Sequence, residues 1–186
     1  MRGKAEGFAD YSVYTTEQLL DAYAKGESEI RRVIAGLSDS DLEARPRGPK
    51  SWSIKEIVLH LLDSEIQGVY RIRKAWAEPG ATLPTYEEDL WTAKFNHQQA
   101  TRAEMEQALA LFGLLRQDTM KVFQRAGEKD WTERYAQHPK YGRLTLGNLL
   151  EIYADHSERH IAQILTIREK LSKPMRRQPL LPQRLY

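Results

Sequence analysis

Apolar residues recur at helical spacing in four long segments of this chain. The segments run from about Thr16 to Leu37, Ser53 to Ala77, Thr101 to Arg125 and Thr145 to Leu171. Within each segment an apolar side chain returns every three or four residues, which places these side chains on one face of an α-helix. Four amphipathic helices of similar length predict an all-α fold, a four-helix bundle.

Capping residues support these segment boundaries. Thr15 with Gln18, and Ser53 with Glu56, have the spacing of a capping box, and Thr145 is a good N-cap residue. Because proline and glycine disfavour helix continuation, they mark the ends of three segments, at Pro79-Gly80, Gly127 and Pro174.

The connections between the segments are long. Residues 38–51 predict a loop, and residues 79–96 predict a longer one that has room for one short helix. Residues 128–143 predict a third loop, with a short extended piece near Tyr135. The second connection is long enough to cross over an end of the bundle, so strict up-down-up-down order does not follow. We expect a bundle domain over residues 1–171 and an extended, proline-containing basic tail over residues 172–186.

Composition narrows the classes of function. The chain has 186 residues and no cysteine, which excludes disulfides, thiolate metal ligands and a cysteine nucleophile. No apolar run is long enough to span a bilayer, and Met1 to Asp10 lack the apolar core of a secretory signal. We therefore expect a cytoplasmic protein without a membrane partner.

The net charge of +2 comes from the tail. Residues 172–186 carry no acid and four cations, Lys173, Arg176, Arg177 and Arg184. Terminal cations of this kind are usually solvated, and the rest of the chain is slightly acidic. Nucleic-acid binding needs a basic face on the folded body, so we do not expect a nucleic-acid partner.

Three histidines are the strongest candidates for chemistry. His156 and His160 stand four residues apart, so they lie on one face of the fourth helix, one turn apart. His60 lies in the second helix. Three neutral imidazoles from two helices can hold one divalent metal ion and leave a fourth position open, as catalytic rather than structural sites do.

Helical periodicity indicates where these side chains point. His160 falls within the apolar stripe of its helix, and His156 lies just outside it. His60 lies away from the apolar stripe of the second helix and shares a face with Ser64, Gln67 and Arg71. A metal ion would then sit at a polar seam or at the mouth of the bundle.

Other interpretations remain open at this point. A lone histidine on an apolar stripe is more often a hydrogen-bonded core residue, and a histidine on a polar face is more often a surface residue. His97 and His138 lie in or near loops, where we expect solvated side chains. No histidine is preceded by glutamate at the third position, which argues against a ferritin-like di-iron bundle. Zincin, Walker A, dinucleotide-binding and nucleophile-elbow motifs are also absent.

Four segments, in this order, resemble the DinB-like superfamily. They are W-S-I-K-E-I-V-L-H-L-L-D-S-E from Trp52, Y-E-E-D-L-W from Tyr86, H-P-K-Y-G-R-L-T-L from His138 and L-T-L-G-N-L-L-E-I-Y-A-D-H-S-E-R-H-I-A-Q-I from Leu144. The resemblance covers about residues 10–171. It is nearest to the branch of metal-dependent hydrolases that is grouped with bacillithiol transferases.

The resemblance implies a four-helix bundle, one zinc or nickel ion per chain bound by His60, His156 and His160, and a homodimer. It also implies one of two activities, the transfer of a low-molecular-weight thiol to an electrophile or metal-dependent hydrolysis. Many relatives carry a histidine where this chain has Arg159, so the chemistry of the cleft can differ. A non-catalytic metal-binding dimer is a further alternative.

Polar neighbours of the three histidines give a second set of predictions. Asp63 and Gln163 each follow a candidate ligand by three residues, so each can orient an imidazole, although both could equally be exposed polar residues. Glu65 lies near the apolar stripe and should have a partner if it is buried. Tyr86, Asp89 and Trp91 could line the mouth of a cleft or simply pack their loop onto the bundle.

Overall fold

Four long helices dominate the computed structural model, which describes residues 10–48 and 51–181. They are α1 (Thr16–Ile34), α3 (Ile54–Ala77), α5 (Arg102–Gln124) and α7 (Leu146–Lys170). The predicted all-α four-helix bundle is confirmed. The sequence predictions for residues 1–9 and for Arg184 lie outside the described residues.

Each long helix starts at a capping box. The N-cap residues are Thr15, Ser53, Thr101 and Thr145, and each side chain accepts a hydrogen bond from the backbone N–H three residues later. The first helix ends at Ile34, three residues before the predicted end. Gly36 follows with a φ of +73°, a left-handed conformation that ends the helix there.

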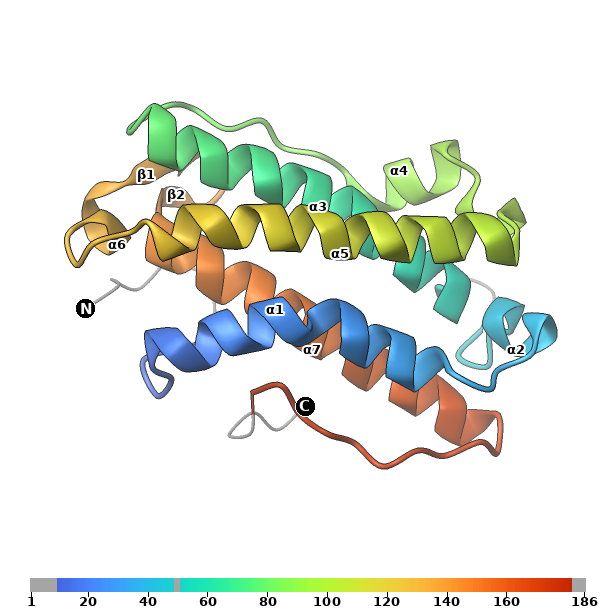
Figure 1. The fold of residues 1–186 in the computed structure, drawn as a ribbon. Helices are drawn as coiled ribbons and strands as arrows, with labels where there is room; N and C mark the ends of the chain where they lie inside the picture. The colour runs from blue at the N-terminus through green and yellow to red at the C-terminus, as the bar shows by residue number, and fades with distance from the viewer. Residues whose placement is uncertain (1–9, 49–50, 182–186) are drawn as a thin grey trace.

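The bundle does not follow up-down-up-down order. Helix α1 packs against α5 and α7, and α3 packs against the same two helices. Figure 1 shows α3 and α5 running in one direction, while α1 and α7 run in the other. Because α3 and α5 are parallel, residues 78–101 must return along the length of α3. We call this segment the crossover connection.

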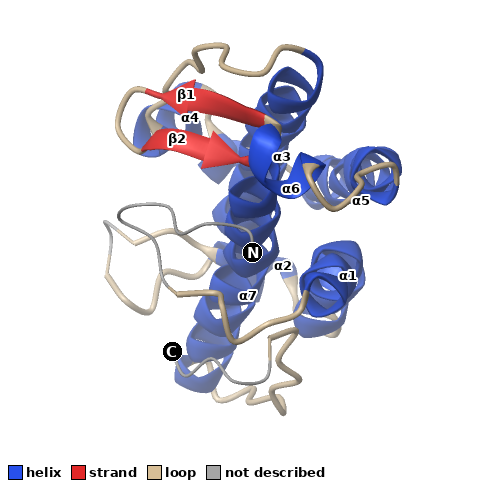
Figure 2. Cartoon of the chain, turned by 90° about the vertical axis from the view of Figure 1, so that its left-hand side faces the viewer, coloured by secondary structure: helices blue, strands red, loops and turns tan. Residues whose placement is uncertain are grey.

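Short elements occupy the connections. They are α2 (Asp39–Glu43), α4 (Glu88–Lys94), the 3-10 helix η1 (His97–Gln99), α6 (Asp130–Glu133) and the strands β1 (Tyr135–His138) and β2 (Gly142–Thr145). The two strands form an antiparallel hairpin at one end of the bundle, with Tyr135 opposite Thr145 (Figure 2). Residue 83 donates its backbone N–H to the Gln137 carbonyl, which ties the crossover connection to the hairpin.

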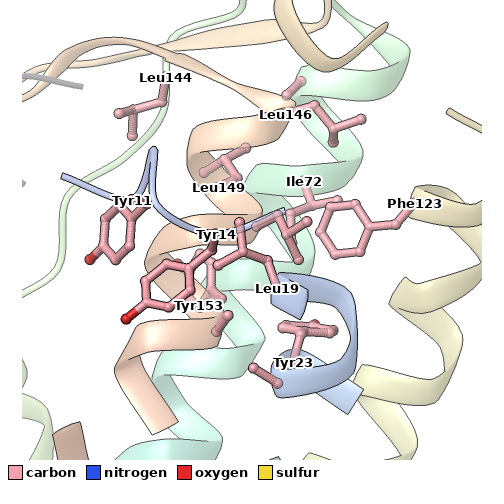
Figure 3. Close-up of a cluster of buried hydrophobic side chains, with 14 of the residues drawn as sticks. Tyr11, Tyr14, Leu19, Tyr23, Ile72, Phe123, Leu144, Leu146, Leu149 and Tyr153 are labelled. Carbon is pink, nitrogen blue, oxygen red and sulfur yellow. The ribbon is translucent and has the colours of Figure 1, made fainter. Parts of the chain in front are cut away.

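The apolar core forms two clusters along the bundle. One lies near the hairpin and joins α1, α3, α5 and α7 to the segment before α1, which contributes Tyr11 and Tyr14 (Figure 3). The other lies toward α2 and includes Leu42, Phe112 and Ile161. Among the described residues, no helix has both the length and the apolar character needed to cross a membrane.

Residues 173–181 lie against the bundle. Leu181 is fully buried in the core cluster near the hairpin. Lys173 forms an ion pair with Asp41, and Arg177 forms one with the buried carboxylate of Glu158. The expectation of solvated tail cations is therefore wrong for Arg177, whereas Lys173 is ion-paired but remains exposed.

Candidate metal centre

Three histidine rings meet between α3 and α7. The Nε2 atom of His156 lies 3.3 Å from His60 Nε2 and 3.1 Å from His160 Nε2. All the candidate ligand atoms lie within 4.8 Å of one another. The structure thus brings together the three histidines that helical spacing predicts.

The spacing of these nitrogens fits a tetrahedral metal site. Zinc binds imidazole nitrogen at about 2.0–2.1 Å, which places two ligand nitrogens of a tetrahedral site about 3.3 Å apart. The two observed separations, 3.3 and 3.1 Å, are close to this value.

Hydrogen bonding alone does not satisfy all three nitrogens. His160 Nδ1 lies 3.0 Å from Gln163 Oε1, and an amide oxygen only accepts, so His160 carries its proton on Nδ1. Its Nε2 atom therefore presents a lone pair to His156. If His156 Nε2 donates its proton to that lone pair, it has no second proton and no lone pair with which to bond His60 Nε2. A single cation satisfies all three lone pairs, so the residues present fit a metal ion.

Burial keeps these imidazoles neutral, as metal ligands must be. Burial lowers the pKa of His60 to about 3, with a smaller contribution from His160. Burial, followed by the positive charge of Arg159, lowers the pKa of His160 to about 4. Burial also holds the pKa of His156 well below its usual value. No proton needs to leave these nitrogens at neutral pH before a cation can bind.

His60 is more deeply buried than its position on a polar helical face predicts. Only 1% of the residue is exposed. The Trp52 ring, from the segment before α3, lies over it with a ring-centre distance of 4.5 Å. The Nδ1 atom of His60 is buried and has no hydrogen-bond partner within residues 10–48 and 51–181.

The two predicted orienting residues have different outcomes. Gln163 contacts His160 Nδ1, as the three-residue spacing predicts. Asp63 does not orient His60, because its Oδ2 atom pairs with His97 Nε2 at 2.7 Å. His97 belongs to the crossover connection and lies 34 residues later in the sequence, and it is the hydrogen-bond partner of the Asp63 carboxylate.

The expectation that His97 and His138 are solvated is wrong. His97 is buried because its contact with Asp63 fastens η1 onto α3. His138 is buried in the hairpin, where its Nδ1 atom accepts hydrogen bonds from the backbone N–H groups of Lys140 and Tyr141. Neither histidine belongs to the three-histidine cluster.

A cleft opens beside the cluster. A cavity of about 340 Å³ is lined by His156 and residues from α3, α7, the hairpin and the crossover connection. A second cavity of about 650 Å³, called the outer cavity, is lined by none of the three histidines. It shares four lining residues with the first, or inner, cavity: Arg71, Tyr86, Glu88 and Tyr141. The two cavities form one elongated cleft that leads to the histidines.

The predicted cleft residues of the crossover connection behave differently from one another. Tyr86 lines both cavities and Asp89 lines the outer one. Trp91 packs against Tyr86 and Phe95 instead, which fits its alternative role of holding the loop down.

Sequence reasoning missed Glu88. Its Oε2 atom lies 4.0 Å from His60 Nε2, so this carboxylate stands at the histidine end of the cleft. Burial raises the pKa of Glu88, although Arg159 and Arg71 oppose that shift. All three acids of the Y-E-E-D run line the cleft, but only Glu88, the first residue of α4, also lines the cavity beside His156.

Arg159 lines the cleft next to His156. Its Nε atom lies 3.3 Å from Asp155 Oδ2, and about half of its side chain is exposed. Asp155 also accepts a hydrogen bond from the hydroxyl of Tyr11. Arg159 therefore adds positive charge at the rim of the cleft and leaves the three-histidine cluster intact.

The sequence matches the family model of the DinB superfamily over residues 22–164. Similar proteins include one named as a putative metal-dependent hydrolase from Bacillus mycoides, which is 24% identical over 161 residues, covering 84% of this chain and 90% of that protein. A similarly named protein from Oceanobacillus iheyensis is 23% identical over 138 residues, covering 74% of this chain and 77% of that protein.

The fold also resembles a solved structure. YfiT from Bacillus subtilis is described as a probable metal-dependent hydrolase with an unusual four-helix bundle topology. It superposes with a TM-score of 0.78 and 20% identity, over 89% of this chain and 94% of that one. At this level of identity the likeness concerns the fold.

Proposed function

Since this chain belongs to the DinB superfamily, we propose that it is a metal-dependent enzyme whose single divalent ion is bound by His60, His156 and His160. The observation that carries the proposal is the convergence of three neutral imidazoles beside an open cleft, with His156 Nε2 lying 3.3 Å from His60 Nε2 and 3.1 Å from His160 Nε2. Imidazole donors suit zinc and nickel, and we propose one of these two metals.

When bound, the metal would act as a Lewis acid that lowers the pKa of a nucleophile in its open position. The chain supplies the rest of the site. Gln163 holds the His160 ring so that Nε2 faces the cluster, and Trp52 shields His60 from solvent. Glu88 Oε2 is within reach of the cluster and is placed to accept the proton that the nucleophile releases.

The nucleophile in the leading version of this proposal is a low-molecular-weight thiol. The chain has no cysteine, so a sulfur nucleophile must come from a cosubstrate. The thiol gives its proton to Glu88, its sulfur bonds to the electrophilic carbon, and the leaving group departs with the bonding electrons. The two connected cavities offer room for a thiol and an electrophile together.

Hydrolysis is the second candidate, because the similar proteins carry that name. Water would then occupy the place of the thiol, and Glu88 would accept its proton. The two versions share one site and differ in the nucleophile. In either version we propose a cytoplasmic homodimer that acts on small molecules.

Metal analysis of protein purified without an affinity tag tests the site. We expect about one equivalent of metal per chain, lost in the His60→Ala and His156→Ala variants. His138→Ala is the matched control, since it removes a buried histidine outside the cluster. Full metal retention in both cluster variants would refute the proposed site.

Activity assays separate the candidate functions. Metal-loaded protein is incubated with a panel of biological thiols and 1-chloro-2,4-dinitrobenzene, and separately with a panel of chromogenic esters. Thiol conjugation that disappears in His156→Ala supports transfer, whereas ester cleavage with the same dependence supports hydrolysis. The absence of both would favour a non-catalytic metal-binding protein.

A further inference from the structure

Arg71 occupies the cleft as a cation without an acidic partner. It comes from α3 and lines both cavities. Its Nη1 atom donates to the hydroxyl of Tyr153 at 3.1 Å, and its Nη2 atom lies 3.5 Å from the Pro84 carbonyl. Within residues 10–48 and 51–181, its buried Nε has no hydrogen-bond partner and the side chain forms no ion pair with a carboxylate.

The guanidinium is held at a fixed place relative to the histidines. Tyr153, which contacts it, precedes His156 by three residues on α7, one turn away. The Tyr153 ring lies directly on α3, where a Cβ at Gly68 would come within 2.7 Å of it. Arg71 is therefore positioned by packing between α3 and α7.

Neither acid that lines the inner cavity forms an ion pair with Arg71, although the charge of Arg71 partly offsets the rise that burial causes in the pKa of Glu88. Glu88 lies at the histidine end, 4.0 Å from His60 Nε2, and the other lining acid, Asp155, is already bonded to Arg159 and Tyr11. Arg71 is thus the lining cation that has no described ion-pair partner. Four tyrosines, Tyr11, Tyr86, Tyr141 and Tyr153, line the same cavity and bring phenol groups to its wall. One guanidinium supplies one positive charge, which matches a singly charged carboxylate, and its planar N–H groups fit the two carboxylate oxygens.

From this arrangement we propose that Arg71 binds a carboxylate on the substrate or cosubstrate whose reacting atom lies at the three histidines. The inference rests on the proposed function, because that function places the reacting end of the ligand at the histidines and Arg71 would bind its other end. Arg71 follows His60 by 11 residues, about 16 Å along α3, and its side chain leans back toward the helix start. The ligand is therefore elongated, with its carboxylate about 10 Å from its reacting atom.

Two pairs of probes test this carboxylate subsite. In the metal-free protein, suberate is compared with the neutral 1,8-octanediol by ligand-observed NMR. In the zinc-loaded protein, suberic monohydroxamate is compared with octanohydroxamate by calorimetry, so that the hydroxamate binds the metal and only the far end differs. Each pair is measured on wild type, Arg71→Gln and Arg71→Lys. Arg73→Gln is the control, since Arg73 lies on the same helix as Arg71 but is exposed and paired with Asp118 of α5.

We expect the carboxylate probe to bind at least about tenfold tighter than its neutral counterpart, the effect of one charged hydrogen bond. Arg71→Gln should abolish that preference, Arg71→Lys should keep part of it and Arg73→Gln all of it. Equal binding of both probes, or a preference that survives Arg71→Gln, overturns the proposal. If suberate binding depends on Arg71 but hydroxamates bind equally with and without zinc, the carboxylate subsite stands and the metal site fails.

Discussion

Two buried polar clusters lie a turn or two apart in this bundle, and they differ in how their hydrogen bonds are satisfied. In the first, Arg116 donates to Glu65, to the Tyr23 carbonyl and to the Tyr153 carbonyl, while the Tyr23 hydroxyl donates to Glu65. The predicted need of Glu65 for a partner is thereby confirmed. In the second, three imidazole nitrogens face one another.

This difference distinguishes a cluster that stabilises the fold from a cluster that is a candidate binding site. The arginine cluster contains a cation, Arg116, and its counterion, Glu65, so it needs no ligand from outside. It joins α1, α3, α5 and α7. The histidine cluster has too few donors for the lone pairs that face one another, an arrangement that suits a bound cation. A buried polar cluster is therefore not by itself a sign of a binding site. The sign is a set of hydrogen-bond donors or acceptors that lack partners.

Removing Arg116 should have the largest effect. Arg116→Met leaves the Glu65 carboxylate buried without its countercharge, which costs about 3–5 kcal/mol of unfolding free energy. Urea unfolding of the metal-free protein measures this loss. The control Arg73→Met, which breaks an exposed pair with Asp118, should cost about 0–1 kcal/mol. Similar losses in the two variants would contradict a structural role for the arginine cluster.

Adding metal should act on the histidine cluster alone. At a free metal concentration of 100 times Kd, binding to the folded state stabilises the wild type by about 2.7 kcal/mol. We expect a corresponding rise in Tm by calorimetry, absent in His156→Ala and present in His138→Ala. A rise of equal size in His156→Ala would mean that the metal binds elsewhere.

Acid should also distinguish the clusters. The pKa values of His60 and His160 are lowered in the fold to about 3 and about 4, so the unfolded chain, with histidine pKa near 6.5, binds protons first. The stability of the metal-free protein is therefore full above about pH 6.5 and falls as the pH drops toward 4.

Each of these histidines steepens that fall by up to about 1.4 kcal/mol per pH unit. Chemical unfolding at pH 7.5, 6.5 and 5.5 measures the slope, and His60→Phe should make it shallower. A slope that is unchanged in His60→Phe would show that His60 does not contribute to the acid sensitivity.

The smallest effect should come from the residue that orients a histidine. Gln163→Ala removes the acceptor for His160 Nδ1, which should weaken metal binding by about tenfold and leave the unfolding free energy of the metal-free protein nearly unchanged. Competition against a chelating dye measures the affinity. Gln163→Glu should retain it, because a carboxylate accepts the same hydrogen bond.

Local signals predict much of the fold and the core of the site. The capping boxes at Thr15 and Ser53 place the helix starts, and four-residue spacing puts His156 and His160 on one face. The short helix in the second connection and the extended piece near Tyr135 also appear, as α4 and β1. These features depend on neighbours within one or two turns.

Contacts between distant segments explain the remaining differences. Asp63 and His97 are 34 residues apart, so no local pattern could show that they pair. Glu158 looks like a surface residue on its helix, yet it is buried beneath Arg177 from the tail. Arg116 lies on α5, and its partners come from three other helices that are distant in the sequence.

The parallel course of α3 and α5 has a consequence for how such a cleft can diversify. It requires a connection as long as the bundle. That connection supplies Tyr86, Glu88 and Asp89 to the cleft. A few buried residues, such as Leu83 and His97, pack it against the rest of the protein. Residues 85–90 can then change without disturbing the helical core, so the ligand preference and the stability of this fold can evolve separately.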